Sequence, residues 1–471
     1  MIWNFETFGS NPAVINQNGT TVSYADLLFA SDRVAQHIPG RCLVFNLCAN
    51  ETGSLLGYVS FLNNRIVPFL VEAGLDSALL ASLLDTYRPD FIWCPSRMAS
   101  GFKSFRPIYH DFAYSLLKTP YNNEYPLYEH LALLLTTSGS TGSPKLVRLS
   151  YENIQSNTSS IARYLNLSKT QRPITTLPMS YTYGLSIINA HLYVGAAVIL
   201  TDKTLMQKAF WQQLKAFEAT SFGGVPYTYE MLDKLRFFRM DLPALQTMTQ
   251  AGGKLSPELH KKFAEYALAN GKNFIVMYGQ TEATARMAYL PGEKTLEKCG
   301  SMGIVIPGGC FSLIEDDGKE IDGPDMAGEL VYKGKNVSLG YARCGEDLSL
   351  GDERNGVLVT GDIAKRDADG YYYVVGRKKR FLKIFGTRIN LDEVERMMKT
   401  AFPDVDSACA GKDDLMFVFL TDDTLHDSVR RFLAQKTGLH FSAFRCQAVS
   451  QIPKTDAGKT LYKDLARYYE A

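Results

Sequence analysis

Short apolar runs alternate with amphipathic stretches through most of the chain. In the N-terminal part these runs fall at residues 41–48, 65–71 and 91–95. Such alternation is typical of βα units, in which a buried strand of a parallel sheet is followed by a helix. The pattern therefore predicts a first α/β sheet in this part of the chain.

The same alternation returns between residues 173 and 278. Helix-like segments, such as residues 207–219 and 257–271, lie among apolar runs that predict strands at residues 174–177, 197–201, 220–223, 248–252 and 273–278. The longest apolar stretch, residues 185–200, contains Asn189 and His191. It is too short to cross a bilayer about 30 Å thick, so we expect a buried helix followed by a strand. The simplest architecture has two sheets of doubly wound type.

Beyond about residue 300 the sequence becomes rich in glycine and strand-like. Asp317-Gly318 and Asp369-Gly370 are typical of hairpin turns and predict a β-rich subdomain. The last part contains helix-like and strand-like segments, with helices expected at residues 391–401, 425–437 and 461–469, two strands around Asp413-Asp414, and a strand at residues 445–450. We therefore expect an α/β protein with a large domain, residues 1–378, made of two α/β sheets and a β-rich subdomain, and a small α+β domain, residues 379–471.

Composition narrows the class of protein. Hydrophobic residues make up 46% of the chain and charged residues 21%, which is typical of a globular protein. Fifty basic and 49 acidic residues leave a formal charge of +1, which argues against a nucleic-acid binder. The eight cysteines form no CxxC pair and the seven histidines show no metal-ligand spacing. The first residues resemble no signal peptide, so we expect a cytoplasmic enzyme with reduced thiols and without a membrane span.

A loop rich in hydroxyl groups and glycine follows the apolar run at residues 131–135. Residues 136–145 contain six hydroxyl side chains, two glycines and Lys145. Backbone N–H groups at glycines, hydroxyl donors and an ammonium group suit a polyanion such as a triphosphate. The spacing of glycines and lysine differs from that of a Walker A loop. From composition alone, a flexible linker explains the segment equally well.

The loop resembles, almost residue for residue, the phosphate-loop motif of the adenylate-forming enzymes. This superfamily contains acyl- and aryl-CoA synthetases, luciferases and the adenylation domains of peptide synthetases. Further segments resemble its other motifs in the same order, at residues 22–27, 278–282, 328–341, 360–362, 376–377 and 453–459. The resemblance implies a mobile C-terminal domain and ATP- and Mg²⁺-dependent activation of a carboxylic acid to an acyl-AMP, with release of pyrophosphate.

The resemblance also assigns the nucleotide site. The residues implied to bind ATP are Thr137, Ser138, Gly139, Ser140, Thr141, Gly142, Lys145, Gly252, Gly253, Tyr278, Gly279, Thr281, Asp362, Arg377 and Lys459. Asp362 would accept hydrogen bonds from the ribose hydroxyls, although a Thr-Gly-Asp turn is an alternative explanation. Arg377 would support the ribose, or it is a solvated charge. Tyr278 would lie against adenine, or it is a core aromatic, and the two glycines at 252 and 253 would either admit the purine or form a tight turn.

The residues implied to be catalytic are Lys459, Thr281, Glu282 and Lys145. Glu282 suits Mg²⁺, which prefers oxygen ligands, although a glutamate also suits the first turn of a helix. Adenylation joins a carboxylate to a phosphate, so a cation must neutralise the charge that builds up, and Lys459 would supply it. In relatives the C-terminal domain rotates at the position of Lys379, and Lys383 and Gly386 would then line the approach of a thiol. An ordinary basic linker is the alternative explanation for Lys379.

A second group of residues resembles the pocket for the acid. Its members would be Tyr181, Tyr183, Gly184, Gly224, Val225 and Arg286. Relatives that activate amino acids place an aspartate near the position of Tyr181, where it pairs with the substrate ammonium, so the neutral Tyr181 favours a simple carboxylic acid. Arg286 would hold a second anionic group of the substrate or form a surface ion pair. The chain is short for the superfamily, which favours a small or medium-sized acid.

Three questions about the reaction stay open at the level of sequence. The acyl group would pass to a thiol, either CoA or the phosphopantetheine of an acyl carrier protein, or to an amine to give an amide. A catalytically silent scaffold that binds acyl nucleotides is a rival, against which Lys145, Glu282, Asp362 and Lys459 argue together. A kinase-like or ATPase role would give ADP instead of AMP.

Overall fold

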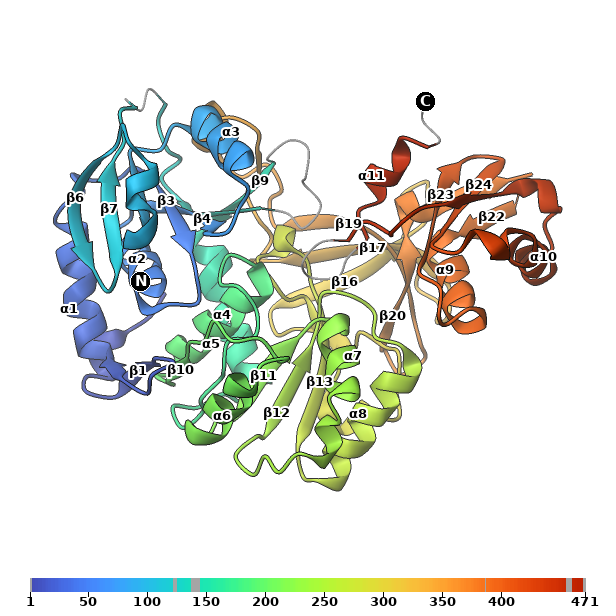
Figure 1. Ribbon diagram of the computed structural model, residues 1–471, viewed down its shortest axis with the longest axis horizontal. Coiled ribbons are helices and arrows are strands. Elements are labelled where there is room, and N and C mark those ends of the chain that lie inside the picture. Colours follow the sequence, from blue (N-terminus) through green and yellow to red (C-terminus); the bar gives the residue numbers. More distant parts are fainter. Residues whose placement is uncertain (1, 122–124, 137–144, 386, 455–459, 469–471) are drawn as a thin grey trace. The chain divides into compact units, whose positions relative to one another are not determined.

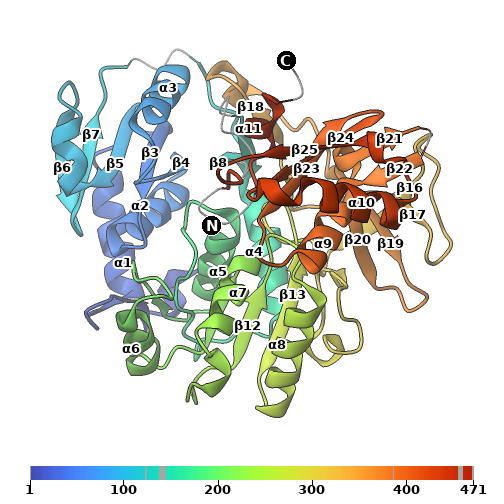
Figure 2. The same cartoon turned by 45° about the vertical axis from the view of Figure 1, so that its right-hand side comes forward.

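The computed structural model describes residues 2–121, 125–136, 145–385, 387–454 and 460–468. The chain divides into two compact units, shown in Figures 1 and 2: unit 1 comprises Met1–Phe311 and Tyr332–Leu358, and unit 2 comprises Ser312–Val331 and Val359–Ala471. This division differs from the boundary that the sequence suggests between residues 378 and 379. A functional boundary at residue 379 stays a prediction.

The largest sheet of unit 1 has eight strands in the order β18-β9-β8-β4-β3-β5-β7-β6. These strands are β3 (Leu43–Cys48), β4 (Val67–Glu72), β5 (Phe91–Pro95), β6 (Arg106–Asp111), β7 (Tyr114–Lys118), β8 (Leu131–Thr136), β9 (Leu146–Ser150) and β18 (Gly340–Ala342). Strands β4, β3 and β5 pair in parallel, as expected, and β8 also pairs in parallel with β4. The neighbours on either side pair antiparallel, so the sheet is mixed.

Helices cover both faces of this sheet. Successive side chains of each strand point to opposite faces, so each strand contributes to two cores. In β5, Phe91 and Trp93 belong to the core beneath α2 (Thr52–Asn63), whereas Ile92 and Cys94 face the core that includes α3 (Ser77–Tyr87). Helix α1 (Tyr24–Ala35), which the motif at residues 22–27 begins, packs against α2. A strand buried on both faces explains why its sequence is continuously apolar.

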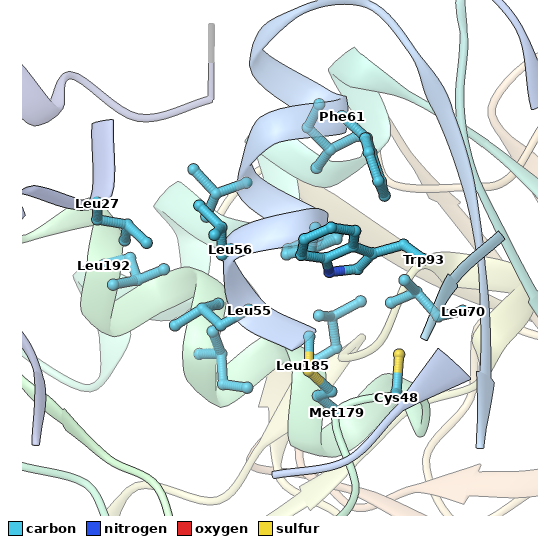
Figure 3. Packing of buried hydrophobic residues seen from close by; sticks show 14 of the residues in the cluster. Leu27, Cys48, Leu55, Leu56, Phe61, Leu70, Trp93, Met179, Leu185 and Leu192 are labelled. Atoms are coloured by element: carbon cyan, nitrogen blue, oxygen red, sulfur yellow. The ribbon is translucent and has the colours of Figure 1, made fainter. Parts of the chain in front are cut away.

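Trp93 shows how closely α2 packs on the sheet (Figure 3). Its indole lies near Leu70 and Cys48 of the sheet, and its Nε1–H donates to the Gly53 carbonyl at 2.7 Å. A Cβ added at Gly57 would lie 2.3 Å from the indole ring. The glycine lets the helix approach the tryptophan, which favours a dense core.

The second sheet of unit 1 has the order β11-β12-β13-β14-β15. Its strands are β11 (Ser221–Gly224), β12 (Thr247–Gln250), β13 (Asn273–Tyr278), β14 (Ala288–Tyr289) and β15 (Ile304–Val305). The first three pair in parallel and the last two antiparallel. The associated helices are α4 (Tyr151–Tyr164), α5 (Thr182–Tyr193), α6 (Lys208–Ala216), α7 (Pro226–Lys234) and α8 (Pro257–Ala269).

Two of the expected strands of this sheet differ from the prediction. The run at residues 197–201 forms β10 (Val198–Ile199), which lies in a separate sheet beside β1 (Pro12–Ile15) and β2 (Thr21–Ser23). The run at residues 174–177 makes only isolated bridges at Pro173 and Ile174. Pro173 lacks a backbone donor, which limits pairing there. The expected buried helix followed by a strand at residues 185–200 is confirmed by α5 and β10.

Unit 2 contains most of a four-stranded sheet and two smaller ones. The sheet order β16-β17-β19-β20 joins β16 (Gly309–Ile314), β17 (Ala327–Gly334), β19 (Val357–Arg366) and β20 (Tyr372–Arg377). The hairpin expected at Asp369-Gly370 joins β19 to β20. The remaining elements are β21 (Phe381–Ile384), β22 (Thr387–Asn390), α9 (Leu391–Ala401), β23 (Ser407–Lys412), β24 (Leu415–Leu420), α10 (His426–Thr437), β25 (Phe444–Ala448) and α11 (Tyr462–Ala466).

Short 3₁₀ helices complete the fold. They are η1 (Phe5–Thr7), η2 (Ser96–Gly101), η3 (Phe237–Arg239), η4 (Thr281–Ala283), η5 (Gly292–Lys294), η6 (Glu346–Ser349), η7 (Lys378–Arg380), η8 (Asp423–Leu425) and η9 (Phe441–Ala443). Within the described residues, no helix is long and apolar enough to span a membrane. The eight cysteines are free thiols.

Candidate active site

Lys145 and Tyr341 meet at the start of β9. Lys145 directly precedes this strand, and β18 pairs antiparallel with it so that Tyr341 lies opposite Val147. The Lys145 Nζ lies 3.1 Å from the centroid of the Tyr341 ring, and the Arg354 guanidinium carbon lies 4.7 Å from the same centroid. An aromatic face attracts cations. The paired strands thus hold an ammonium group at the end of the predicted phosphate loop.

Glu282 contacts the same tyrosine from the segment that follows β13. The Tyr341 hydroxyl donates a hydrogen bond to Glu282 Oε1 at 2.7 Å, and the Ser338 backbone N–H donates to the Glu282 carbonyl at 2.9 Å. Burial, together with the Glu282 carboxylate, raises the pKa of Tyr341 to about 12. The phenol therefore stays a donor at neutral pH. Lys145 and Glu282, both predicted to be catalytic, share Tyr341 as a contact.

The chain turns sharply directly after η4. Thr284 has φ 65° and ψ −56°, and the Ala285 N–H donates to the Ala283 carbonyl at 2.7 Å. These values describe the rare, strained form of the γ-turn. The Thr182 hydroxyl donates to the Thr284 carbonyl, and the Thr284 hydroxyl donates to the Asn336 carbonyl at 2.7 Å. Such strain persists only where neighbours enforce it, and it is concentrated at functional sites.

Arg286, two residues beyond this turn, is 2% exposed. Its Nε donates to the Ser186 hydroxyl at 3.1 Å, and its Nη1 donates to the Tyr164 hydroxyl and the Met277 sulfur, both at 3.1 Å. Its guanidinium carbon lies 5.2 Å from the centroid of the Tyr183 ring. A surface ion pair, one of the two explanations from sequence, is wrong because the side chain is buried and no described carboxylate pairs with it.

The residues predicted to line the acid pocket lie close to one another. A Cβ at Gly252, whose φ is +84°, would lie 2.8 Å from the Tyr181 hydroxyl and 3.1 Å from Val225 Cγ1. The Tyr183 hydroxyl lies 2.8 Å from the Thr249 hydroxyl. Tyr181, Tyr183 and Val225 belong to one apolar cluster. A side chain larger than glycine at position 252 would displace this wall.

Three further predicted glycines are also tightly packed. A Cβ at Gly184 would lie 2.3 Å from the Pro178 carbonyl oxygen, and one at Gly224 would lie 2.7 Å from the Thr228 side chain. Gly253 is close to Pro226, which a Cβ would approach to 3.0 Å. These glycines allow the chain segments of the pocket wall to come together.

The adenine and α-phosphate motif lies at the end of β13. The Tyr278 hydroxyl is 3.3 Å from Gln280 Nε2, and Tyr278 is half-buried. Thr281 is buried, with 8% of its surface exposed. A Cβ at Gly279 would lie 1.7 Å from the Ala285 carbonyl oxygen, so only glycine fits there. The chain folds back on itself at this motif, which fixes Tyr278 and Thr281 at the end of a strand.

In unit 2, Asp362 and Arg377 lie opposite each other on β19 and β20. Asp362 is 4% exposed, and Arg377 Nε lies 3.4 Å from its Oδ1. The Thr360 hydroxyl accepts a hydrogen bond from the Asp362 N–H at 3.1 Å. The hairpin thus brings together the two residues predicted to bind ribose, with a carboxylate beside a largely exposed guanidinium.

For the remaining predicted site residues, the structure describes few contacts or none. Lys383 lies exposed on β21, and its N–H donates to Asp413 Oδ1 at 2.8 Å. Lys379 belongs to η7. Outside the described residues lie Thr137, Ser138, Gly139, Ser140, Thr141, Gly142, Gly386 and Lys459. Their roles stay predictions.

Sequence reasoning missed several contacts of this site. Tyr341 was recognised only as part of a motif, although it touches both Lys145 and Glu282. Asn336 lies within the same motif, residues 328–341, and was not singled out, yet its side-chain amide donates to the carbonyls of Ala283 and Arg286. No local pattern in the sequence reveals these partners, because each comes from a distant segment.

Comparison with known proteins defines the class to which this fold and site belong. The sequence pattern of the family described as AMP-binding enzyme matches residues 107–342, which is half of the chain. This range contains Lys145, Glu282, Arg286 and Tyr341. The protein belongs to the AMP-binding enzyme family and is thus a member of the adenylate-forming superfamily.

Curated relatives include several CoA ligases. The oxalate–CoA ligase of Arabidopsis thaliana is 29% identical over 72% of this chain and 67% of its own. The sulfoacetate–CoA ligase of Cupriavidus necator is 27% identical over 70% of this chain and 65% of its own. A long-chain-fatty-acid–CoA ligase of Salmonella typhimurium is 28% identical over 72% and 61%. The matches therefore span about two thirds or less of the relatives' lengths.

Solved structures support the same fold over nearly the whole chain. An o-succinylbenzoate CoA synthetase from Bacillus subtilis in complex with AMP aligns with a TM-score of 0.77 at 21% identity, covering 97% of this chain and 95% of that one. ATP-bound MatB from Rhodopseudomonas palustris aligns with a TM-score of 0.78 at 21% identity, covering 99% and 98%. The expected α/β fold class is confirmed.

Proposed function

We propose that this protein activates a carboxylic acid with Mg·ATP to an acyl-AMP, releases pyrophosphate, and transfers the acyl group to a thiol. The observation that carries the proposal is the contact of Lys145 and Glu282 with Tyr341 inside the segment that matches the AMP-binding family. A cation that precedes β9 and a carboxylate on η4, both in contact with Tyr341, suit a nucleotide with its metal ion. The relatives named as CoA ligases support an acid–thiol ligase.

The donor set around Glu282 fits magnesium delivered with a nucleotide. Mg²⁺ usually takes one or two protein carboxylates and completes its shell with water and phosphate oxygens. Within the described residues there is no group of three His, Cys, Asp or Glu side chains that could hold a metal by themselves. Tyr341 occupies Oε1 of Glu282, and the hydrogen bond fixes the orientation of the carboxylate. Glu282 would thus offer one oxygen to the ion.

Mg·ATP, when bound, supplies the electrophilic α-phosphorus and the pyrophosphate leaving group. Lys145 would attract the phosphates, and the strained segment before Arg286 would fix Thr281 and Glu282 near them. Asp362 would hold the ribose hydroxyls in unit 2. Lys459 would neutralise the charge that develops when the carboxylate meets the α-phosphate. Rotation at Lys379 would then withdraw Lys459 and present Lys383 and Gly386 to the thiol.

The pocket residues favour an acid without an α-amino group. Burial raises the pKa of Tyr181, so its phenol stays neutral and gives an ammonium group no ionic partner. CoA is the first candidate for the acceptor, because the curated relatives above carry CoA in their names. An acyl carrier protein is the second candidate, and an amine acceptor is the alternative.

The proposal is tested by acid-dependent exchange of labelled pyrophosphate into ATP over a broad panel of carboxylic acids. Exchange with at least one acid, loss of exchange in Lys459→Ala, and AMP as the nucleotide product are expected. Lys463→Ala, an exposed lysine on α11, is the matched control. Absence of exchange with every acid would favour a silent scaffold, and ADP as the product would favour a kinase or ATPase. Thioester and amide products distinguish the acceptors.

A further inference from the structure

Arg286 carries a buried positive charge that the chain does not neutralise. Its described hydrogen-bond partners are two hydroxyl groups and a thioether, and its ring contact is with a phenol. Among the described residues, no carboxylate lies within ion-pairing distance, and no hydrogen bond engages Nη2. An arginine stays charged at any physiological pH. A buried charge is costly unless it is paired, so this arrangement calls for an anion.

The groups nearest to Arg286 stay neutral. Burial raises the pKa of Tyr164 and that of Tyr183, although Arg286 acts in the opposite direction on both. Burial lowers the pKa of His191 to about 4, and Arg286 contributes to the lowering. Neither phenolate nor imidazolium therefore forms at neutral pH. The net charge of this buried cluster is that of the guanidinium.

The backbone of Arg286 is held firmly. The Asn157 side chain donates to the Arg286 carbonyl at 2.8 Å and accepts from its N–H at 3.4 Å. Asn336 Nδ2 donates to the same carbonyl at 3.2 Å. The strained γ-turn at Thr284 lies two residues before it. A binding group whose backbone is fixed in advance loses little entropy when a ligand arrives.

Arg286 adjoins the apolar wall of the predicted acid pocket. Tyr183 and Met277, which it contacts, belong to the same apolar cluster as Tyr181 and Val225. Ser186 and Tyr183 lie on α5, and Tyr164 ends α4, which packs beside α5 (Figure 1). The guanidinium thus forms a charged end to a cluster that is otherwise apolar and phenolic.

We propose that Arg286 binds a second anionic group of the acid substrate, so that the protein activates acids carrying a further carboxylate or sulfonate. This inference rests on the proposed adenylation of a carboxylic acid. Charge-assisted hydrogen bonds from a planar guanidinium suit a carboxylate or sulfonate. The substrate anion supplies the counter-charge that the chain omits. An acid lacking it leaves the guanidinium buried and unpaired, which provides discrimination.

Matched pairs of acids test the inference on the unmodified protein. Each linear or aromatic dicarboxylic acid is compared with its mono-amide, in which a neutral amide of equal size replaces the second carboxylate. Sulfonated acids are compared with the corresponding sulfonamides. Pyrophosphate release with Mg·ATP gives kcat/KM for each compound. We expect the best dianionic acid to exceed its neutral partner by about 100-fold or more, as for a buried charge pair that loses one member.

Arg286→Met, which keeps a similar length without charge, should reverse this preference. Arg163→Met, an exposed arginine on α4, is the control that should leave the preference unchanged. Arg286→Lys retains the charge and should therefore retain part of the preference for the dianionic acid. It replaces Arg286→Met in the test if the methionine variant does not fold. The ratio between two acids measured on one preparation does not depend on the fraction of folded protein. A purely structural role of Arg286 would not change this ratio.

The outcomes separate this inference from the proposed function. A reversed preference in Arg286→Met supports it. Preference of the unmodified protein for neutral partners, or an equal loss of both classes in Arg286→Met, overturns the inference while the ligase function stands. If no acid of any class supports pyrophosphate release, both the inference and the proposed function are overturned.

Discussion

Arg380 in unit 2 and Arg286 in unit 1 are both buried, but the chain neutralises only Arg380. The Nε of Arg380 lies 2.8 Å from Asp392 Oδ1, and its Nη2 lies 2.7 Å from Glu395 Oε1. Its guanidinium carbon also lies 3.8 Å from the centroid of the Tyr462 ring. Arg286 has a similar ring contact but only neutral hydrogen-bond partners among the described residues. The difference distinguishes an arginine that holds the fold together from one that suits a ligand.

A third buried arginine supports this distinction. The side chain of Arg148 is 0% exposed, and its Nη2 lies 2.5 Å from Glu353 Oε2. It also donates to the Tyr341 carbonyl at 3.0 Å, which ties β9 to β18. At both Arg380 and Arg148, a carboxylate accompanies the buried guanidinium. The lack of one at Arg286 therefore marks it as different.

Removing the neutralised arginine should have the largest effect on stability. Arg380→Met leaves Asp392 and Glu395 without their counter-ion, and breaking a buried pair costs about 3–5 kcal/mol. We expect amides of α9 and β23 to lose protection in hydrogen-exchange mass spectrometry by a corresponding amount. Arg396→Met, an exposed arginine on α9, should have little effect. Adding Glu395→Gln should restore part of the loss, and protection unchanged in Arg380→Met would refute the structural assignment.

Burial of His191, together with the nearby charge of Arg286, should make the protein sensitive to acid. The folded protein keeps His191 neutral with a pKa near 4, whereas the unfolded chain titrates near 6.5. Because the unfolded state binds more protons between these values, stability falls as pH falls, by about 2 kcal/mol from pH 7 to pH 5. The midpoints of urea denaturation at pH 7 and at pH 5 measure this change in stability. His191→Gln should lack this loss of stability between pH 7 and pH 5. His130→Gln, which replaces an exposed histidine, should show the same loss as the unmodified protein.

Glu282, like Arg286, has a neutral hydrogen-bond partner, but here the partner would orient a carboxylate for the predicted metal ion. Tyr341→Phe removes the hydrogen bond to Glu282 and keeps the ring that Lys145 contacts. Loss of such a supporting bond typically lowers metal affinity or activity by about tenfold. The Mg²⁺ concentration for half-maximal pyrophosphate exchange should rise accordingly. Tyr193→Phe, an exposed tyrosine on α5, is the control, and an unchanged Mg²⁺ requirement would mean that Tyr341 does not orient the ligand.

Periodicity and motif order could be predicted from the sequence, because both are local. Helix α9 coincides with the predicted residues 391–401, and the parallel strands of the first sheet fall at their expected places. Antiparallel β9 and β18 were missed, because pairing between segments so far apart leaves no periodic trace. The neutral surroundings of Arg286 were equally hidden, since they come from α4, α5 and β13. The sequence offered a substrate anion or a surface ion pair; burial excludes the surface ion pair, and the substrate anion stays a proposal.

The smallest expected effect on stability is that of Arg286→Met. The substitution loses hydrogen bonds to Ser186 and Tyr164, each worth about 1.5–3 kcal/mol because the donor is charged. It also relieves the folded protein of the cost of burying a lone cation, which is on the order of several kcal/mol. These terms offset, so we expect a change of no more than about 1 kcal/mol in urea denaturation at pH 7. A loss as large as that of Arg380→Met would show that neutral partners alone can make a buried arginine essential to the fold.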